Sequence, residues 1–185
     1  MSNNRQAVIE RAIEVLDDYG LADLTMRRLG SELGVRQSAI YHHFASKQEL
    51  LAAVADELLE RGFDEFRVSE DSPWTERATA VCDVFRRSLV ACSDGADVVA
   101  TAYSFGLGGR RPVDELSTVL AEAGFERPVV LAGTAALVNY VFGFVIDEQT
   151  RDRATRLGVE VAEREGAVAF SDGLGLVLDG IASRR

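Results

Sequence analysis

The stretch Thr25–Lys47, TMRRLGSELGVRQSAIYHHFASK, decides the fold that this sequence predicts. Met26, Leu29 and Leu33 recur at the spacing of one buried helical face. Gly34 can adopt the backbone turn that two crossing helices require. The stretch therefore predicts two short helices joined by a tight turn, with Thr25 as the N-cap of the first.

The second helix of this pair, expected over Gln37–Phe44, carries the chemistry. Ile40 and Phe44 lie four residues apart and are expected to dock on the preceding helices. Gln can pair with adenine in the major groove, and a Tyr ring can contact a thymine methyl. The outward side chains are expected to be Gln37, Ser38, Tyr41 and His42, with His43 at the edge. This pattern is typical of a helix-turn-helix DNA reader, although an ordinary three-helix packing unit with a polar surface is an alternative.

The charge distribution restricts where DNA can dock. The chain has 185 residues and a formal net charge of −10. The six Lys and Arg residues up to Lys47 are balanced by six Asp and Glu residues, so the net charge falls on residues 48–185. The neutral first part is therefore the expected site for a polyanion. Phosphate contacts are expected from Arg27, Arg28, Arg36 and Lys47.

Apolar residues recur at helical spacing along the rest of the chain, without strand alternation. The sequence predicts an all-α fold with a three-helix DNA-binding domain over residues 1–46 and a second helical domain over 47–185. Helices are expected at about 4–19, 25–33, 37–44, 46–66, 73–92, after 94, 113–123, 128–150 and 167–183, with 151–165 as a short helix or a mobile link. We expect Gly20 to end the first helix, Tyr19 to lie on its buried stripe, Ser46 and Glu49 to form a capping box, and Asp94 to cap a later helix.

The run Pro128–Ile146 is almost entirely apolar. A membrane span is one interpretation, but burial in protein is favoured because the rest of the chain is amphipathic. The last helix is also apolar and rich in glycine, so we expect these two helices to form a homodimer with a second copy. The N-terminus shows no secretion signal. Cys82 and Cys92 are interpreted as buried, reduced thiols of a cytoplasmic protein.

The run Leu24–Leu51, LTMRRLGSELGVRQSAIYHHFASKQELL, resembles the DNA-binding segment of the TetR family of transcriptional repressors. Further along, Ser72–Trp74, Asp94–Ala96, Gly124-Phe125 and Phe144–Gln149 resemble the C-terminal domain of the tetracycline-repressor branch of that family. The resemblance implies an all-helical homodimer that binds operator DNA and releases it when a small molecule binds. By position it implies DNA contacts from Thr25, Arg27, Gln37, Ser38, Tyr41, His43 and Lys47, with Ser38 standing where the tetracycline repressors have proline.

The same resemblance implies a changed effector pocket. Val99 stands where the tetracycline repressors use a histidine to bind the drug's metal ion. Phe85 and Leu131 keep the apolar character of their positions, and Asp147 keeps the acidic group that aids the metal through water. Polar drug contacts are replaced by apolar residues, so we expect a fairly apolar effector and no metal or cofactor. The candidate ligand residues are Phe63, Val81, Phe85, Val99, Ala102, Tyr103, Leu116, Leu131 and Asn139. The alternative is that they only fill a core.

Other functions find less support in the residues. No Ser/His/Asp, paired-carboxylate or Cys/His arrangement indicates an enzyme. The glycines of Gly106–Gly109 lack the preceding strand and following Lys of a phosphate cradle. The acidic remainder disfavours a DNA-coating protein. An all-helical small-molecule carrier or enzyme without specific DNA binding remains the alternative to a ligand-responsive repressor.

Overall fold

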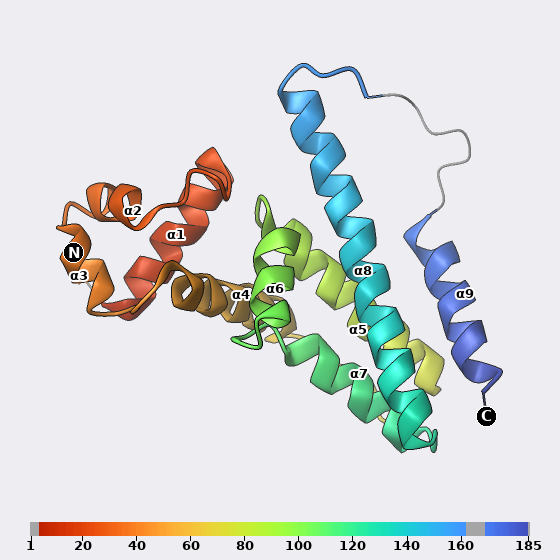
Figure 1. Ribbon diagram of the computed structural model, residues 1–185. Helices are drawn as coiled ribbons and strands as arrows, with labels where there is room; N and C mark the ends of the chain where they lie inside the picture. Colours follow the sequence, from red (N-terminus) through yellow and green to blue (C-terminus); the bar gives the residue numbers. More distant parts are fainter. Residues whose placement is uncertain (1–3, 162–168, 185) are drawn as a thin grey trace. The chain divides into compact units, whose positions relative to one another are not determined.

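The computed structural model describes residues 4–161 and 169–184, and within these ranges every regular element is an α-helix (Figure 1). This confirms the all-α prediction. The chain forms two compact units. The first comprises Met1–Asp64 and Ser88–Arg110, and the second comprises Glu65–Arg87 and Arg111–Arg185. The expected functional division at residues 46 and 47 stays a prediction.

The first unit contains the two short helices of the predicted reader together with three longer helices. Its helices are α1 (Arg5–Tyr19), α2 (Met26–Glu32), α3 (Gln37–Tyr41), α4 (Lys47–Phe63) and α6 (Gly95–Ser104). Pairs that pack together include α1 with α4, α2 with α3, and α4 with α6. Its core includes Leu16, Leu29, Ile40, Phe44 and Leu59, each at most 1% exposed. The short reader helices thus share one core with α1 and α4.

Local signals set most helix ends of this unit. The Asn4 side chain caps α1, Thr25 Oγ1 accepts from Arg28 N at 3.1 Å, and Gly20 ends α1 with φ 81°. The Ser46 and Glu49 capping box is confirmed in part. Ser46 Oγ accepts from Glu49 N at 3.1 Å, but the Glu49 carboxylate reaches back to Ala45 N at 2.8 Å.

Three expectations for the first unit are wrong. The helix α3 ends at Tyr41 instead of Phe44, because the backbone tightens so that His43 N and Phe44 N both donate to Ile40 O. The helix α4 ends at Phe63 instead of residue 66. Tyr19 is 49% exposed instead of buried, because its ring is covered only by a neighbouring arginine on the surface.

The second unit contains most of α5 (Trp74–Val90), α7 (Arg111–Glu122), α8 (Arg127–Arg156) and α9 (Phe170–Ala182). Pro73 lies just before α5, and its carbonyl accepts the bond from Arg77 N, so it is not the first helical residue. The expected link at 151–165 is wrong for its first six residues, which continue α8. The expected start of the last helix at residue 167 lies outside the described residues.

The long helix α8 is only partly buried within its unit. Of the described helices, it alone is long and apolar enough to cross a membrane by length and composition, and 44% of its most apolar window is buried. Thr134, Leu137, Val138 and Val141 lie on its buried side. Its other side remains open, as a helix that also meets a second copy would be.

A cation and three aromatic rings fix the start of α9. Arg86 of α5 donates to both carboxylate oxygens of Glu148 on α8, at 2.8 and 2.9 Å. Its guanidinium lies 5.5 and 5.4 Å from the ring centroids of Phe144 and Phe170. Tyr140 Oη donates to Phe170 O at 2.7 Å. These contacts hold α9 alongside α8 (Figure 1).

Candidate nucleic-acid interface and effector region

The recognition helix α3 presents one polar face to solvent. Gln37, Ser38, Tyr41 and His42 are exposed, Tyr41 by 46%, and His43 is half-buried. On the opposite side, Ile40 is fully buried. The structure thus brings together, on α3 and the two residues that follow it, the side chains that the sequence assigned to base contact, although their role as DNA contacts stays a prediction.

Two glycines set the angle between α2 and α3. Gly34 adopts φ 66°, in the left-handed region, and Val35 N donates to Gly30 O at 2.8 Å. A Cβ on Gly30 would lie 3.1 Å from Val35 O and 3.3 Å from Gln37 N. Gly30 therefore allows the close approach of the recognition helix. The sequence analysis identified Gly34 but missed Gly30. The sequence around a glycine inside a helix does not indicate whether the backbone of another segment packs against it.

The four predicted phosphate contacts differ in availability. Arg27 and Arg36 are exposed. The guanidinium of Arg28 lies 4.0 Å from the centroid of Tyr19, and its Nη1 is 3.5 Å from an Asp23 oxygen. Lys47 is half-buried, and its Nζ donates to Leu21 O at 3.4 Å. Two of the four cations are therefore already engaged inside the protein.

Reciprocal hydrogen bonds join the end of α1 to the start of α6. The Asp17 carboxylate accepts from Ser93 N at 2.7 Å, and the Asp94 carboxylate accepts from Leu21 N at 2.7 Å. Asp94 is 8% exposed and holds φ 58°. Asp94 occupies the predicted N-cap position of α6, and its backbone carbonyl accepts from Val98 N at 3.0 Å. Its side chain makes no capping bond, because the carboxylate accepts from Leu21 N. We call these two bonds the α1–α6 clasp.

The other end of α6 is tied to α4. The Asp56 carboxylate accepts from Gly109 N at 2.7 Å. Gly109 holds φ 76°, and a Cβ there would lie 3.2 Å from Val99 O, so a side chain would be strained and crowded. The loop after α6, which contains Gly109, is thus attached to α4 by this hydrogen bond. Because the α1–α6 clasp holds the start of the same helix, α6 is attached at one end to α1 and at the other to α4, which share a core with the reader helices.

The nine candidate ligand residues are distributed over both units. Phe63, Val99, Ala102 and Tyr103 belong to the first unit, and the other five belong to the second. Six of the nine are at most 2% exposed: Phe63, Val81, Phe85, Val99, Ala102 and Leu116. Tyr103 is half-buried, whereas Leu131 and Asn139 are exposed on α8. Asn139 Nδ2 donates to Ala135 O at 2.8 Å, within its own helix. Their shared pocket stays a prediction.

The described residues contain no group of three His, Cys, Asp or Glu side chains placed to hold a metal ion. Cys82 and Cys92 are buried and unbridged, as predicted. Burial, with a smaller effect of the Asp83 carboxylate, raises the pKa of the Cys82 thiol to about 12. Burial and the Asp17 carboxylate also raise the pKa of Cys92. Both thiols therefore stay protonated and unreactive at neutral pH.

Comparison with known proteins places this geometry in a family. Residues 8–54 match the family described as bacterial regulatory proteins, tetR family. Residues 68–165, more than half of the chain, match the tetracyclin repressor-like C-terminal domain. The chain belongs to the TetR family. It is a DNA-binding transcriptional regulator with a helix-turn-helix reader and a helical effector domain.

Individual TetR-family relatives cover almost the whole chain. The class C tetracycline repressor protein of Escherichia coli is 30% identical over 98% of this chain and 91% of its own length. The crystal structure of Mycobacterium smegmatis BioQ is 36% identical, with a TM-score of 0.87, over 98% of this chain and 99% of its own. BioQ bound to its double-stranded DNA operator gives 35% identity and a TM-score of 0.82, over 97% and 98% of the two chains.

A ligand-bound TetR-family structure is also similar. A variant TetR of Acinetobacter baumannii in complex with minocycline is 28% identical, with a TM-score of 0.78, and the match covers 97% of both chains. Homologues of this chain are therefore regulators and not enzymes.

The hydrogen bond from Leu21 N to the Asp94 carboxylate, one of the two bonds of the α1–α6 clasp, should stabilise this TetR-family regulator. Asp94→Ala removes the acceptor of the Leu21 N–H and places alanine at a positive φ. We expect it to destabilise the protein by about 1–3 kcal/mol, because a part-buried donor is left without a partner. Asp94→Asn keeps an oxygen acceptor and tolerates the same backbone conformation, so its loss should be smaller. Thermal denaturation of the two variants measures this.

Asp18→Ala serves as the control, because Asp18 is an exposed residue of the same α1 helix. Hydrogen exchange at the Leu21 amide should accelerate in Asp94→Ala only. Equal melting temperatures for Asp94→Ala and the wild-type protein would show that the clasp contributes nothing to stability.

Proposed function

We propose that this protein is a repressor that binds operator DNA as a homodimer through α3 and is released by a small, fairly apolar effector in the cytoplasm. The proposal rests on the exposed face of α3. Gln37, Ser38 and Tyr41 are exposed on this face, and Ile40 of the same helix is buried. Glutamine and tyrosine at the surface of a recognition helix have the groups that read adenine and thymine in the major groove.

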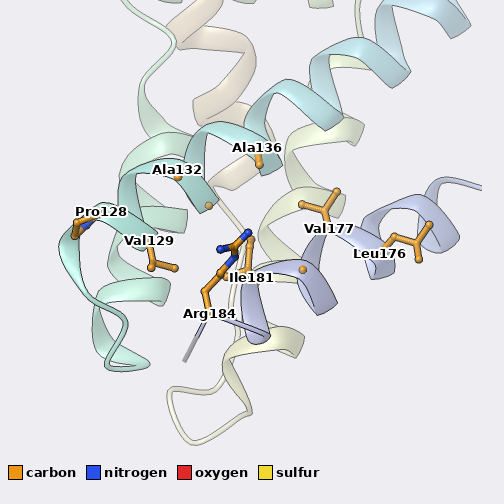
Figure 2. A pocket seen from close by; sticks show the side chains of 10 residues that line it. Pro128, Val129, Ala132, Ala136, Leu176, Val177, Ile181 and Arg184 are labelled. Carbon is orange, nitrogen blue, oxygen red and sulfur yellow. The ribbon is translucent and has the colours of Figure 1, made fainter.

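A groove between α8 and α9 supports the homodimer. Its volume is about 460 Å³, and it lies within the second unit (Figure 2). Figure 2 shows Ala132 and Ala136 of α8 facing Val177 and Ile181 of α9 across it. Gly133 and Gly180 also line the groove. Small residues let helix backbones approach closely, and an exposed apolar surface of this kind favours a four-helix contact with a second copy.

The apolar character of the candidate ligand residues supports the effector class. Val81, Val99 and Leu116 are fully or almost fully buried and offer no hydrogen-bonding group. The polar groups of a strongly polar ligand would find no hydrogen-bond partner among these side chains, at a cost of about 1–3 kcal/mol for each group. A ligand dominated by hydrocarbon surface avoids this cost. We therefore expect the effector to differ chemically from the tetracyclines.

Coupling between effector and operator follows from how α6 is attached. Val99, Ala102 and Tyr103 lie on α6, and its ends are bonded to α1 and α4. An effector that displaces α6 therefore acts on α1 and α4 through hydrogen bonds between backbone N–H groups and aspartate carboxylates. The paired recognition helices must lie roughly 34–36 Å apart to enter successive major grooves. The effector must bind the released arrangement more tightly, or it shifts nothing.

Operator binding is tested with duplex DNA from upstream of the coding region, in a salt series. We expect Tyr41→Ala to weaken the specific complex by about 1–3 kcal/mol, because α3 loses its most prominent exposed side chain. Phe105→Ala is the control, since Phe105 is an exposed aromatic of the same unit at the end of α6. Absence of any specific complex with the wild-type protein would favour the carrier alternative.

Dimerisation is tested by placing a charge in the groove. Ala136→Glu would bury an unpaired carboxylate, which costs on the order of 3–5 kcal/mol, so we expect a monomer by light scattering. Ala135→Glu is a closely matched control, because Ala135 is the exposed neighbour on α8 and does not line the groove. Equal masses for the two variants at low micromolar concentration would rule out this face as the interface.

The effector class is tested by thermal shift with tetracycline and Mg²⁺. We expect no metal-dependent stabilisation, because Val99 has no ligand atom for a metal and its neighbours cannot pair the drug's polar groups. A class C tetracycline repressor serves as the positive control. A clear stabilisation that requires both drug and metal would overturn the apolar-effector proposal and leave the operator proposal intact.

A further inference from the structure

An arginine outside the helix-turn-helix lies against the end of the recognition segment. Arg5 is the first residue of α1, and its guanidinium carbon lies 4.8 Å from the ring centroid of Phe44. Phe44 lies three residues after Tyr41, the last residue of α3, and is fully buried. The Arg5 side chain is exposed. A cation from the start of the chain therefore stands beside the segment that contains Tyr41 and His43.

Arg5 is exposed, so its contact with the Phe44 ring leaves N–H donors of the guanidinium accessible to solvent. An aromatic ring under a guanidinium contacts its π-face, whereas its five N–H donors point outward in the plane. Within the described ranges, no carboxylate forms an ion pair with Arg5. Stacking also restricts the side chain before any ligand arrives, so less rotamer entropy is lost on binding. The fork that remains matches a phosphate oxygen pair.

The contrast with Arg28 strengthens this assignment. Arg28 also stacks on an aromatic ring, that of Tyr19, but its Nη1 lies 3.5 Å from Asp23 and part of its edge is buried. Its donors are directed into the protein. Arg5 combines the same kind of stacking with an exposed edge. Of these two arginines, the one outside the sequence motif is the better placed to meet an anion.

We propose that Arg5 is a further operator-contacting residue, which binds a backbone phosphate of the DNA from the platform of Phe44. The proposal rests on operator binding through α3 and adds a contact that the motif does not contain. A phosphate contact positions the protein on DNA without reading sequence. Arg5 should therefore contribute equally to specific and non-specific duplexes, whereas Gln37 and Tyr41 should contribute to the specific duplex alone.

The test compares three variants by fluorescence anisotropy on a specific and a scrambled duplex, between 50 and 200 mM salt. Arg5→Met keeps an unbranched chain over Phe44 and removes the charge. We expect its affinity for both duplexes to fall by a similar factor, roughly threefold to tenfold, and the slope of log K against log salt to fall by about 0.9. Arg5→Lys should retain the slope and lose part of the affinity, because lysine stacks less well.

Arg11→Ala is the matched control, since Arg11 lies on the same helix and is paired with Glu14 at 2.6 Å. Its salt slope should equal that of the wild-type protein. Melting temperatures of all variants separate loss of folding from loss of contact. A wild-type slope in Arg5→Met with intact specific binding would overturn the assignment of Arg5 and leave operator binding standing. Loss of specific binding alone would assign Arg5 to base recognition and also overturn the phosphate contact.

Discussion

The hydrogen bond from Leu21 N to the Asp94 carboxylate joins positions 73 residues apart in the sequence, and the arrangement of the first unit depends on it. It is reinforced by the reciprocal bond from Ser93 N to Asp17 and, at the far end of α6, by the bond from Gly109 N to Asp56. Each is a charge-assisted bond of 2.7 Å from a backbone donor to a carboxylate. In the first bond the neighbour of α6 contributes a backbone N–H, that of Leu21, whereas Asp17 and Asp56 contribute carboxylate side chains.

Such an arrangement gives the acidic residues of the first unit a structural use. Asp17, Asp56 and Asp94 add negative charge near a DNA reader, which opposes association with a polyanion. Their carboxylates are turned towards backbone N–H groups of the protein. The electrostatic repulsion between these carboxylates and DNA is offset because their hydrogen bonds hold α1, α4 and α6 in a fixed arrangement.

The sequence predicted the parts of the fold that are encoded locally. Gly20, Gly34, Thr25 and Ser46 act within a few residues of themselves, and each has the predicted role in the structure. Asp94 is at the predicted N-cap position, but the partner of its side chain is Leu21, which no local pattern connects to it. The early end of α3 has a similar origin, since the chain must turn Phe44 into a core made by other helices.

The same distinction holds for the candidate sites. The exposed face of α3 follows from helical spacing, so Gln37, Ser38 and Tyr41 could be found from the sequence. The engagement of Arg28 with Tyr19 and the stacking of Arg5 on Phe44 join separate helices and could not. The candidate ligand residues were identified from the family resemblance alone. They belong to two units, and the spacing of residues in the sequence does not indicate which residues of one unit lie near residues of the other.

The groove between α8 and α9 has a consequence for how the regulator responds to its own abundance. If two readers bind only as a pair, operator occupancy rises with the square of the monomer concentration below the dimer dissociation constant. A single acidic chain with few free cations contributes little binding by itself. The operator then passes from largely empty to largely filled over a narrower range of protein amount than a monomeric reader would need, even without any effector.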